Sequence, residues 1–297
     1  MLLLTIVMVI STVIFGCDEK VYGAADTRPQ YRTTEVTPVA TAIEAPRAPA
    51  IQPAAVVDSL AARLQDATEE AAKVGANISV AVLDRISHQL VTNGNTRPIA
   101  TASVAKLFIA DDLLVRQPET ALSAEDRAAL DIMLRSSDDG AAETFWNLYG
   151  GNAIITRVAG RYRLTGTSPP SNGAWWNTIS TAPDLARYYD MLLNGSGGLT
   201  PDRANSIIDD LAQSTPTGVD GYPQRFGIPE GLYNESVAVK QGWMCCIGNN
   251  WMHLSTGVVG ADRRYVVVIE SLQPSDDTTA RATITQAIKT IFPGGRI

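Results

Sequence analysis

The chain opens with a strongly hydrophobic stretch. Residues 1–16 carry no charged side chain and consist mostly of Leu, Ile, Val and Met. A helix needs about 20 apolar residues to cross a bilayer, so this stretch is too short to be a membrane span. Its composition fits the core of a secretory signal peptide, and we predict a signal peptide over residues 1–16. The alternative, a buried N-terminal helix, lacks a neighbouring apolar segment that could cover it.

The next segment has the opposite character. Residues 18–53 contain no Leu, Phe or Trp, and they include five prolines among many Ala and Thr residues. Such a composition buries too little apolar surface to offset the conformational entropy that folding costs. We therefore predict that residues 17–53 form an extended Pro/Ala/Thr-rich linker between the N-terminus and a folded domain over residues 54–297.

Residues 54–297 alternate between helical and strand-like periodicity. Helical patterns are expected at 56–71, from Ser103, from Ser123 to Arg135, in shorter stretches up to Arg161, over 184–193, from Pro201 and over 278–292. Strand-like patterns are expected at 78–83, 89–92, 236–240, 251–259 and 265–271, with hairpin turns at 248–250 and 260–262. Ser123 and Asp126 have the spacing of a helix N-cap and its third helical residue.

This order of elements predicts an α+β fold. Strands at both ends of the domain, with helices between them, favour one antiparallel sheet flanked by helices, in which the first and last strands meet. The intervening helices, over about 103–213, form an inserted all-helical subdomain. A cleft is expected where the sheet and this subdomain join.

Composition and charge narrow the function. The 297 residues are 45% hydrophobic and 19% charged, an ordinary globular balance, with 24 basic against 31 acidic side chains and a net charge of −7. Nucleic-acid binders usually carry a basic surface, so nucleic acid is excluded as a partner. Only His88 and His253 are present, and neither accompanies a nucleophile-elbow motif, so catalysis by a Ser-His-Asp triad is not expected.

A serine and a lysine stand together where the first strand region passes into a helix. Ser103-Val104-Ala105-Lys106 places a hydroxyl and an amine at positions i and i+3, which share one face of a helix. Burial lowers the pKa of an amine, so Lys106 could then accept the proton of Ser103. Taken alone, the pattern also fits a helix-capping serine followed by a surface lysine.

Two further motifs follow in the chain: Ser137-Asp138-Asp139 after a predicted helix, and Lys240-Gln241-Gly242 in a predicted strand. In order and context, the three motifs resemble S-x-x-K, S-D-N and K-T-G of the penicillin-recognising serine hydrolases, most closely the class A β-lactamase pattern. Thr181-Ala182-Pro183-Asp184 also resembles the start of the helix that follows the omega loop in that family. The resemblance covers nearly all of residues 54–297.

The resemblance implies a role for each matching residue. Ser103 would be the acylated nucleophile, Lys106 its base, and Ser137 the hydroxyl that carries a proton to the leaving nitrogen. Lys240 would attract the substrate carboxylate, and the backbone amides of Ser103 and Trp243, the residue after Gly242, would form the oxyanion hole. The substrate would be a β-lactam or a D-alanyl peptide. We expect no cofactor and no metal, and a monomer.

Asp139 departs from the family's pattern, which has Asn at this place. A carboxylate can accept hydrogen bonds from a substrate but cannot donate to its carbonyl. An ionised Asp139 about 4 Å from Lys106 would also favour the charged amine by roughly 4 kcal/mol at an effective dielectric near 20. This corresponds to about three pKa units in the wrong direction for a base, so slow activation of Ser103 is expected.

The loop before residue 181 departs further. Residues 161–181 contain no Asp or Glu, whereas class A β-lactamases use a glutamate there to activate the deacylating water. An acyl-enzyme on Ser103 is therefore expected to persist. The 34 positions from Ser103 to Ser137 are also fewer than in typical class A members, which implies a reduced helical subdomain.

Other residues near the motifs leave alternatives open. Gln241 replaces Thr and could donate its amide to a substrate carboxylate. Cys245 and Cys246 are adjacent, and either a strained vicinal disulfide or a free pair fits the sequence. Trp175 and Trp176 either form a wall of the cleft or pack their loop onto the domain.

The N-terminus resembles that of a bacterial envelope lipoprotein of the actinobacterial type. Val13-Ile14-Phe15-Gly16-Cys17 resembles a lipoprotein cleavage box, in which Cys17 becomes the lipidated first residue of the mature protein. Phe15 is bulkier than the motif usually shows, and no Lys or Arg precedes the apolar stretch. The resemblance implies an exported protein that a lipid anchors to the outer face of the cell membrane.

Three functions remain compatible with these patterns. The first is an acyl-serine enzyme of the cell envelope. The second is a catalytically weak module with the same cleft that binds a cell-wall peptide or a protein partner. The third is a purely structural lipoprotein. All enzymatic roles depend on whether Ser103, Lys106, Ser137 and Lys240 meet in one cleft.

Overall fold

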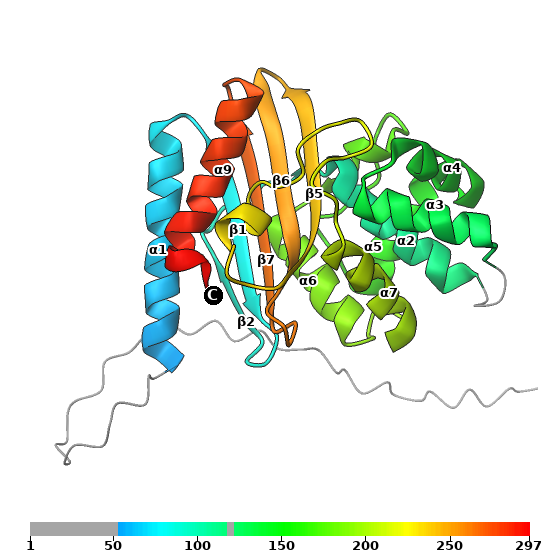
Figure 1. Ribbon diagram of the computed structural model, residues 1–297, viewed down its shortest axis with the longest axis horizontal. Coiled ribbons are helices and arrows are strands. Elements are labelled where there is room, and N and C mark those ends of the chain that lie inside the picture. The colour runs from blue at the N-terminus through cyan, green and yellow to red at the C-terminus, as the bar shows by residue number, and fades with distance from the viewer. Residues whose placement is uncertain (1–52, 118–121) are drawn as a thin grey trace, which may run out of the picture. The chain divides into compact units, whose positions relative to one another are not determined.

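A five-stranded antiparallel sheet forms the centre of the folded chain (Figure 1). The computed structural model describes residues 53–117 and 122–297. The strands stand in the order β2-β1-β7-β6-β5, so the first and last strand segments of the sequence pair in one sheet. Their bounds are β1 (Asn77–Asp84), β2 (Gln89–Thr92), β5 (Val237–Ile247), β6 (Asn250–Val259) and β7 (Tyr265–Gln273).

Two terminal helices cover one face of this sheet (Figure 1). α1 (Pro53–Lys73) and α9 (Asp277–Ile291) lie against each other and pack on the strands. The side chain of Asp276 accepts a hydrogen bond from the Thr279 N–H and so caps α9. The interface is apolar because Leu64, Val80 and Ile288, among others, are fully buried there.

The remaining helices lie on the other side of the sheet (Figure 1). They are α2 (Ala105–Arg116), α3 (Ala124–Arg135), α4 (Asp139–Tyr149), α5 (Asn152–Tyr162), α6 (Ala182–Leu193) and α7 (Pro201–Ala212). Short elements complete the fold: β3 (Ile99–Ala100), η1 (Ala102–Val104), η2 (Trp175–Asn177), β4 (Ile179–Ser180), α8 (Ile228–Gly231) and η3 (Pro293–Gly295). A second apolar core joins α2 and α6 to the sheet.

The predicted α+β architecture is confirmed, with corrections at the level of single elements. Ser123 caps α3 as its spacing predicted, by accepting a hydrogen bond from the Asp126 N–H at 2.9 Å. The strand predicted at 236–240 was too short. β5 continues to Ile247 and pairs with β6 up to that residue, with a bulge after Met244. The pair β3 and β4 was missed, since two-residue strands leave no periodic pattern. The predicted signal peptide, Cys17 and nearly all of the linker lie outside the described residues.

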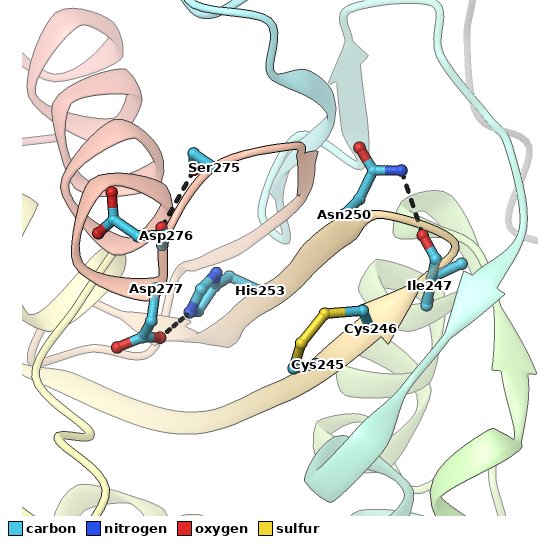
Figure 2. Close-up of a disulfide and its surroundings, with 8 residues drawn as sticks. All are labelled: Cys245, Cys246, Ile247, Asn250, His253, Ser275, Asp276 and Asp277. Atoms are coloured by element: carbon cyan, nitrogen blue, oxygen red, sulfur yellow. Dashed lines mark hydrogen bonds and ion pairs between the residues drawn. A yellow bond between two sulfur atoms is a disulfide. The ribbon is translucent and has the colours of Figure 1, made fainter.

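The end of β5 carries a disulfide between Cys245 and Cys246 (Figure 2). The register of β5 against β6 shifts between Met244 and Ile247, which makes this segment a β-bulge with one extra residue. Both cysteines are exposed. Of the two alternatives that the sequence left open, the structure therefore contains the disulfide.

A polar cluster lies between β6 and the start of α9. His253 is fully buried, and its Nε2 is 2.7 Å from the Tyr222 hydroxyl and 3.3 Å from Asp277 Oδ1 (Figure 2 shows His253 and Asp277). Tyr222 also donates its hydroxyl to Asp277. Burial lowers the pKa of His253 to about 4, although Asp277 opposes this change. The imidazole is therefore neutral at pH 7.

This buried histidine predicts a loss of stability in mild acid. The folded protein binds fewer protons than the unfolded chain between about pH 4 and the ordinary His pKa of about 6.5, so stability falls as the pH falls through this range. The shift corresponds to about 3 kcal/mol in the free energy of unfolding at 1.36 kcal/mol per pKa unit. Urea unfolding of the wild type and of His253→Gln, at intervals from pH 7 to pH 4, measures this contribution as the difference between the two curves. Parallel curves would contradict it.

Candidate active site

Ser103 lies in the tight turn that leads into α2. Its side chain is 7% exposed, and the preceding Ala102 has a left-handed backbone conformation with φ of 46°. Non-glycine residues adopt this conformation at a cost of about 1–3 kcal/mol, usually where the surrounding structure requires it. The short helical turn places Lys106 on the same side, with its Nζ 2.8 Å from Ser103 Oγ.

The Lys106 amine is enclosed by polar groups and by one aromatic ring. It donates to the Ser137 carbonyl oxygen at 2.6 Å and to Asp139 Oδ1 at 2.5 Å, and it lies 4.7 Å from the centre of the Trp175 ring. No part of its side chain is exposed. Burial lowers the pKa of Lys106 below its ordinary value, and Asp139 only partly offsets this effect.

Asp139 and burial act on the Lys106 pKa in opposite directions. Asp139 does act as expected, since its charge raises the pKa of the amine. However, its side chain is 73% exposed, so water screens part of the interaction. Removing Lys106 from water has the larger effect.

Ser137 connects the two buried amines. It follows α3, has a left-handed backbone with φ of 58°, and is 6% exposed. Its Oγ lies 2.8 Å from Lys240 Nζ and 3.3 Å from Lys106 Nζ. Lys240 comes from β5, where it is 1% exposed, and its pKa is well below the ordinary value because of burial and the charge of Lys106. The four predicted residues thus form one chain of contacts: Ser103, Lys106, Ser137 and Lys240.

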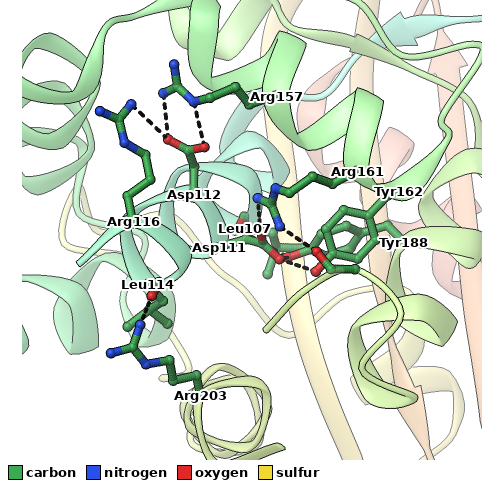
Figure 3. A network of polar contacts seen from close by, with 11 residues as sticks. Leu107, Asp111, Asp112, Leu114, Arg116, Arg157, Arg161, Tyr162, Tyr188 and Arg203 are labelled. Carbon is green, nitrogen blue, oxygen red and sulfur yellow. Dashed lines mark hydrogen bonds and ion pairs between the residues drawn. The ribbon is translucent and has the colours of Figure 1, made fainter. Parts of the chain in front are cut away.

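Buried ion pairs fix the helix that carries Lys106 (Figure 3). On α2, Asp111 accepts hydrogen bonds from Arg161 and from the Tyr162 hydroxyl of α5, and the Tyr162 ring packs against Tyr188. Beside it, Asp112 accepts from Arg157 at 2.9 and 2.6 Å. Asp111 and Asp112 are at most 1% exposed. Losing one partner of a buried pair is strongly destabilising, so these contacts hold α2 firmly against α5.

β5 closes the site from the other side. A side chain at Gly242 would place its Cβ 2.5 Å from the Thr101 carbonyl oxygen, so only glycine allows β5 to approach the Ser103 turn this closely. The next residue, Trp243, lines the same cavity as Ser103. The two residues predicted to form the oxyanion hole therefore line one cavity.

These elements enclose a cavity of about 260 Å³ with Ser103 among its lining residues. Its wall consists of Ala102, Ser103, Asp139, Trp175, Trp176, Asp220, Trp243 and Met244. Another hollow, of about 410 Å³ between α1 and α9, is larger but contains none of the predicted site residues. We therefore take the cavity at Ser103 as the candidate active site.

The structure corrects one predicted binding residue and refines others. Gln241 does not face the cavity, because its buried amide donates to the backbone carbonyls of Gln224 and Phe226 at 3.0 and 2.6 Å. In a strand, neighbouring side chains point to opposite faces, so Gln241 cannot share the orientation of Lys240. Trp175 both packs its loop, at 3% exposure, and lines the cavity, whereas Trp176 is 42% exposed.

Sequence reasoning missed Asp220. Its loop is tied to the Ser137 segment by a hydrogen bond from the Val219 N–H to the Ser136 carbonyl at 2.8 Å. The Asp220 side chain accepts from the Tyr222 N–H at 3.0 Å and lines the cavity. No motif surrounds Asp220 in the sequence, and only the folded loop brings it to Ser103.

The residues that the structure describes contain no candidate metal site. Among residues 53–117 and 122–297, no three His, Cys, Asp or Glu side chains come together in a way that could hold one. Within the same ranges, no helix is long and apolar enough to cross a membrane.

Known proteins resemble this chain at two levels. Proteins named "Putative lipoprotein LppW" from Mycobacterium bovis and Mycobacterium tuberculosis are 64% identical to it, over 100% of this chain and 98% of theirs. No protein-family model matches the chain.

Solved structures share its fold at much lower sequence identity. A β-lactamase from Chitinophaga pinensis has a TM-score of 0.63 at 14% identity, covering 78% of this chain and 98% of its own. A variant of PBP-A, in an acyl-enzyme complex with penicillin G, has a TM-score of 0.62 at 16% identity, covering 79% and 95%. The chain therefore belongs to the LppW family, and it has the fold of the penicillin-recognising serine hydrolases.

Proposed function

We propose that this protein is an acyl-serine hydrolase or penicillin-binding protein of the cell envelope, which acts on β-lactams or D-alanyl peptides and releases its acyl group slowly. One observation carries the proposal. Ser103, Lys106, Ser137 and Lys240 form a continuous series of contacts of 2.8 to 3.3 Å beside a cavity that Ser103 lines.

The proposed reaction starts with proton transfer from Ser103 to Lys106. The 2.8 Å separation of Ser103 Oγ and Lys106 Nζ is within the range for direct transfer, and the lowered pKa of the amine favours its neutral, basic form. Ser103 Oγ then attacks the substrate carbonyl. The backbone N–H groups of Ser103 and Trp243 stabilise the oxyanion, which is worth about 3 kcal/mol per donor in related chemistry.

Ser137 is the proposed proton donor to the leaving nitrogen. Its hydroxyl lies within 3.3 Å of Lys106 Nζ, which holds the proton taken from Ser103. Lys240, at 2.8 Å on the other side, restrains the same hydroxyl. The proton can therefore move from Ser103 through Lys106 to Ser137 without a histidine.

Slow deacylation follows from the loop that covers Lys106. Residues 161–181 offer no carboxylate to activate a water molecule. Instead, the Trp175 ring lies over the Lys106 amine, and its Nε1 donates to Glu143 Oε2 at 3.2 Å. An apolar ring fixed in this place excludes water from that side of the amine, which favours a long-lived acyl-enzyme.

A binding module is the second candidate. Asp139 holds a 2.5 Å ion pair with Lys106, and an amine kept in its charged form cannot accept the Ser103 proton. In that case the cavity would bind a cell-wall peptide or a protein partner without acylation. The outcome depends on whether burial or Asp139 decides the charge of Lys106.

We propose that the protein is exported and anchored by a lipid on Cys17. Two features support this location: the cleavage-box resemblance of Val13 to Cys17, and the lipoprotein name carried by relatives that match the whole chain. The 36 residues from 18 to 53 would then separate the folded domain from the membrane surface.

Incubation with benzylpenicillin tests the enzymatic proposal. We expect the intact mass of the protein to increase by one penicillin molecule and the adduct to persist for much longer than it takes to form. Ser103→Ala removes the nucleophile and should give no adduct. If the wild type also gives no adduct at millimolar penicillin, the acyl-enzyme proposal is wrong and the binding module stands.

Asp139→Asn should accelerate acylation. Loss of a largely exposed carboxylate removes about 1 kcal/mol of support for the charged amine, which lowers the Lys106 pKa. Below that pKa the acylation rate should rise about fivefold, the factor that corresponds to about 1 kcal/mol, and its pH profile should shift to lower pH. Mass spectrometry of samples quenched at set times, across pH 5 to 9, measures the acylation rate and its pH profile. Asp66→Asn, on the exposed side of α1, is the matched control; a wild-type profile for Asp139→Asn would show that Asp139 does not influence the base.

Cys17→Ser should move the protein from the membrane fraction to the soluble fraction of the cells that express it. The reason is that lipidation requires the thiol. Replacing Cys245 and Cys246 together by Ser is the control, since this variant keeps Cys17 and should remain with the membranes. Membrane retention of Cys17→Ser would refute the proposed anchor.

A further inference from the structure

The cavity at Ser103 has an unusual charge distribution for a site expected to bind anions. The charged side chains that line it are Asp139 and Asp220, both exposed carboxylates. The two amines lie beneath its surface, where Lys106 is 0% and Lys240 1% exposed. A ligand in the cavity therefore meets negative groups first.

The buried amines offset this negative charge only in part. Burial lowers the pKa of both lysines, and the charge of Lys106 lowers the pKa of Lys240 further because like charges repel. Lys106 is already paired with Asp139. Lys240 directs its amine at Ser137 Oγ and does not line the cavity, so a substrate carboxylate would find little exposed positive charge.

Aromatic surfaces accompany the carboxylates. Trp175, Trp176 and Trp243 all line the cavity. Trp243 is held in place by parallel stacking on Tyr222, with ring centres 4.5 Å apart and 7° between the planes. Trp175 and Trp176 meet edge to face at 5.3 Å. Aromatic faces attract cations, and Trp does so most strongly.

The position of Asp220 is fixed by its loop. The Val219 N–H donates to the Ser136 carbonyl, and Asp220 itself accepts from the Tyr222 N–H. Tyr222 is in turn the residue on which Trp243 stacks. The Asp220 carboxylate and one aromatic part of the cavity wall are therefore held by the same loop.

We infer that this cavity selects substrates that carry a positively charged amino group near the scissile carbonyl, and that Asp220 determines this specificity. The inference rests on the proposed function, since it assigns a substrate class to the same serine. The ammonium group would lie beside Asp220 and against the indole rings, while Asp139 remains paired with Lys106. Acyl donors with a carboxylate in place of this ammonium group are poorer substrates.

Three nitrophenyl esters of similar length test this assignment: p-nitrophenyl 6-aminohexanoate, p-nitrophenyl hexanoate and mono-p-nitrophenyl adipate. They are cationic, neutral and anionic at pH 7, and all release nitrophenolate when Ser103 is acylated. The acylation rate should fall in that order. Raising the salt concentration should reduce the preference, because exposed charges are screened.

Two matched variants test whether the Asp220 carboxylate is responsible for the preference. Asp220→Asn should reduce the rate ratio of the cationic to the neutral ester by about three- to fivefold, the size expected of one partly exposed charge pair. The charge of Asp220 also raises the pKa of Lys106, an effect that both esters experience equally, so the ratio and not either single rate is the readout. Asp66→Asn, which removes an exposed carboxylate from α1, should preserve the ratio.

The possible results separate the two claims. If no ester gives nitrophenolate release that depends on Ser103, the proposed function fails and this inference fails with it. If release depends on Ser103 but the three esters react equally, or the anionic ester reacts fastest, the inference alone is overturned. An unchanged ratio in Asp220→Asn also overturns it, because another group would then be responsible for any preference.

Discussion

The burial of Lys106 is the constraint on which the candidate site depends. An amine removed from water must either find partners for its charge or lose it, and this structure offers both routes within a few ångströms. Asp139 and the face of the Trp175 ring support the charge, whereas burial in the surrounding core favours its loss. The conformations of the Ser103 turn and of Ser137 are arranged around this one amine.

Much of the fold could be predicted from the sequence because each layer has its own periodicity. The strands β1, β6 and β7 alternate or run apolar between clear turn residues, and α3 carries a cap that can be recognised by its spacing. The lengths of the strands were less predictable. Beyond Lys240, β5 contains a glycine, two cysteines and a bulge, and these residues give no strand pattern although their backbone pairs with β6.

Some residues of the candidate site could likewise be predicted from the sequence, and others could not. Ser103, Lys106, Ser137 and Lys240 stand in short motifs, so a resemblance between sequences could place them together, and the structure brings them into contact. Gln241 was assigned to the cavity because the motif includes it, but strand alternation directs it to the opposite face. For Asp139 the sequence indicated the direction of its effect on Lys106, but not the opposing effect of burial, which depends on the fold. Asp220 was not recognised, since its place depends on a loop conformation that no local pattern encodes.

The contacts behind Trp243 link this wall of the cavity to the last helix of the domain. Trp243 stacks on Tyr222, and Tyr222 donates its hydroxyl to Asp277, the first residue of α9. Ser103 and Lys106, by contrast, are added to the growing chain more than 170 residues before Asp277. During synthesis Ser103 thus exists long before Trp243, and the contact between Tyr222 and Asp277 can form only after the start of α9 has been made. An incomplete chain that ends before β5 would contain Ser103 and Lys106 without Trp243 and the strand that carries it.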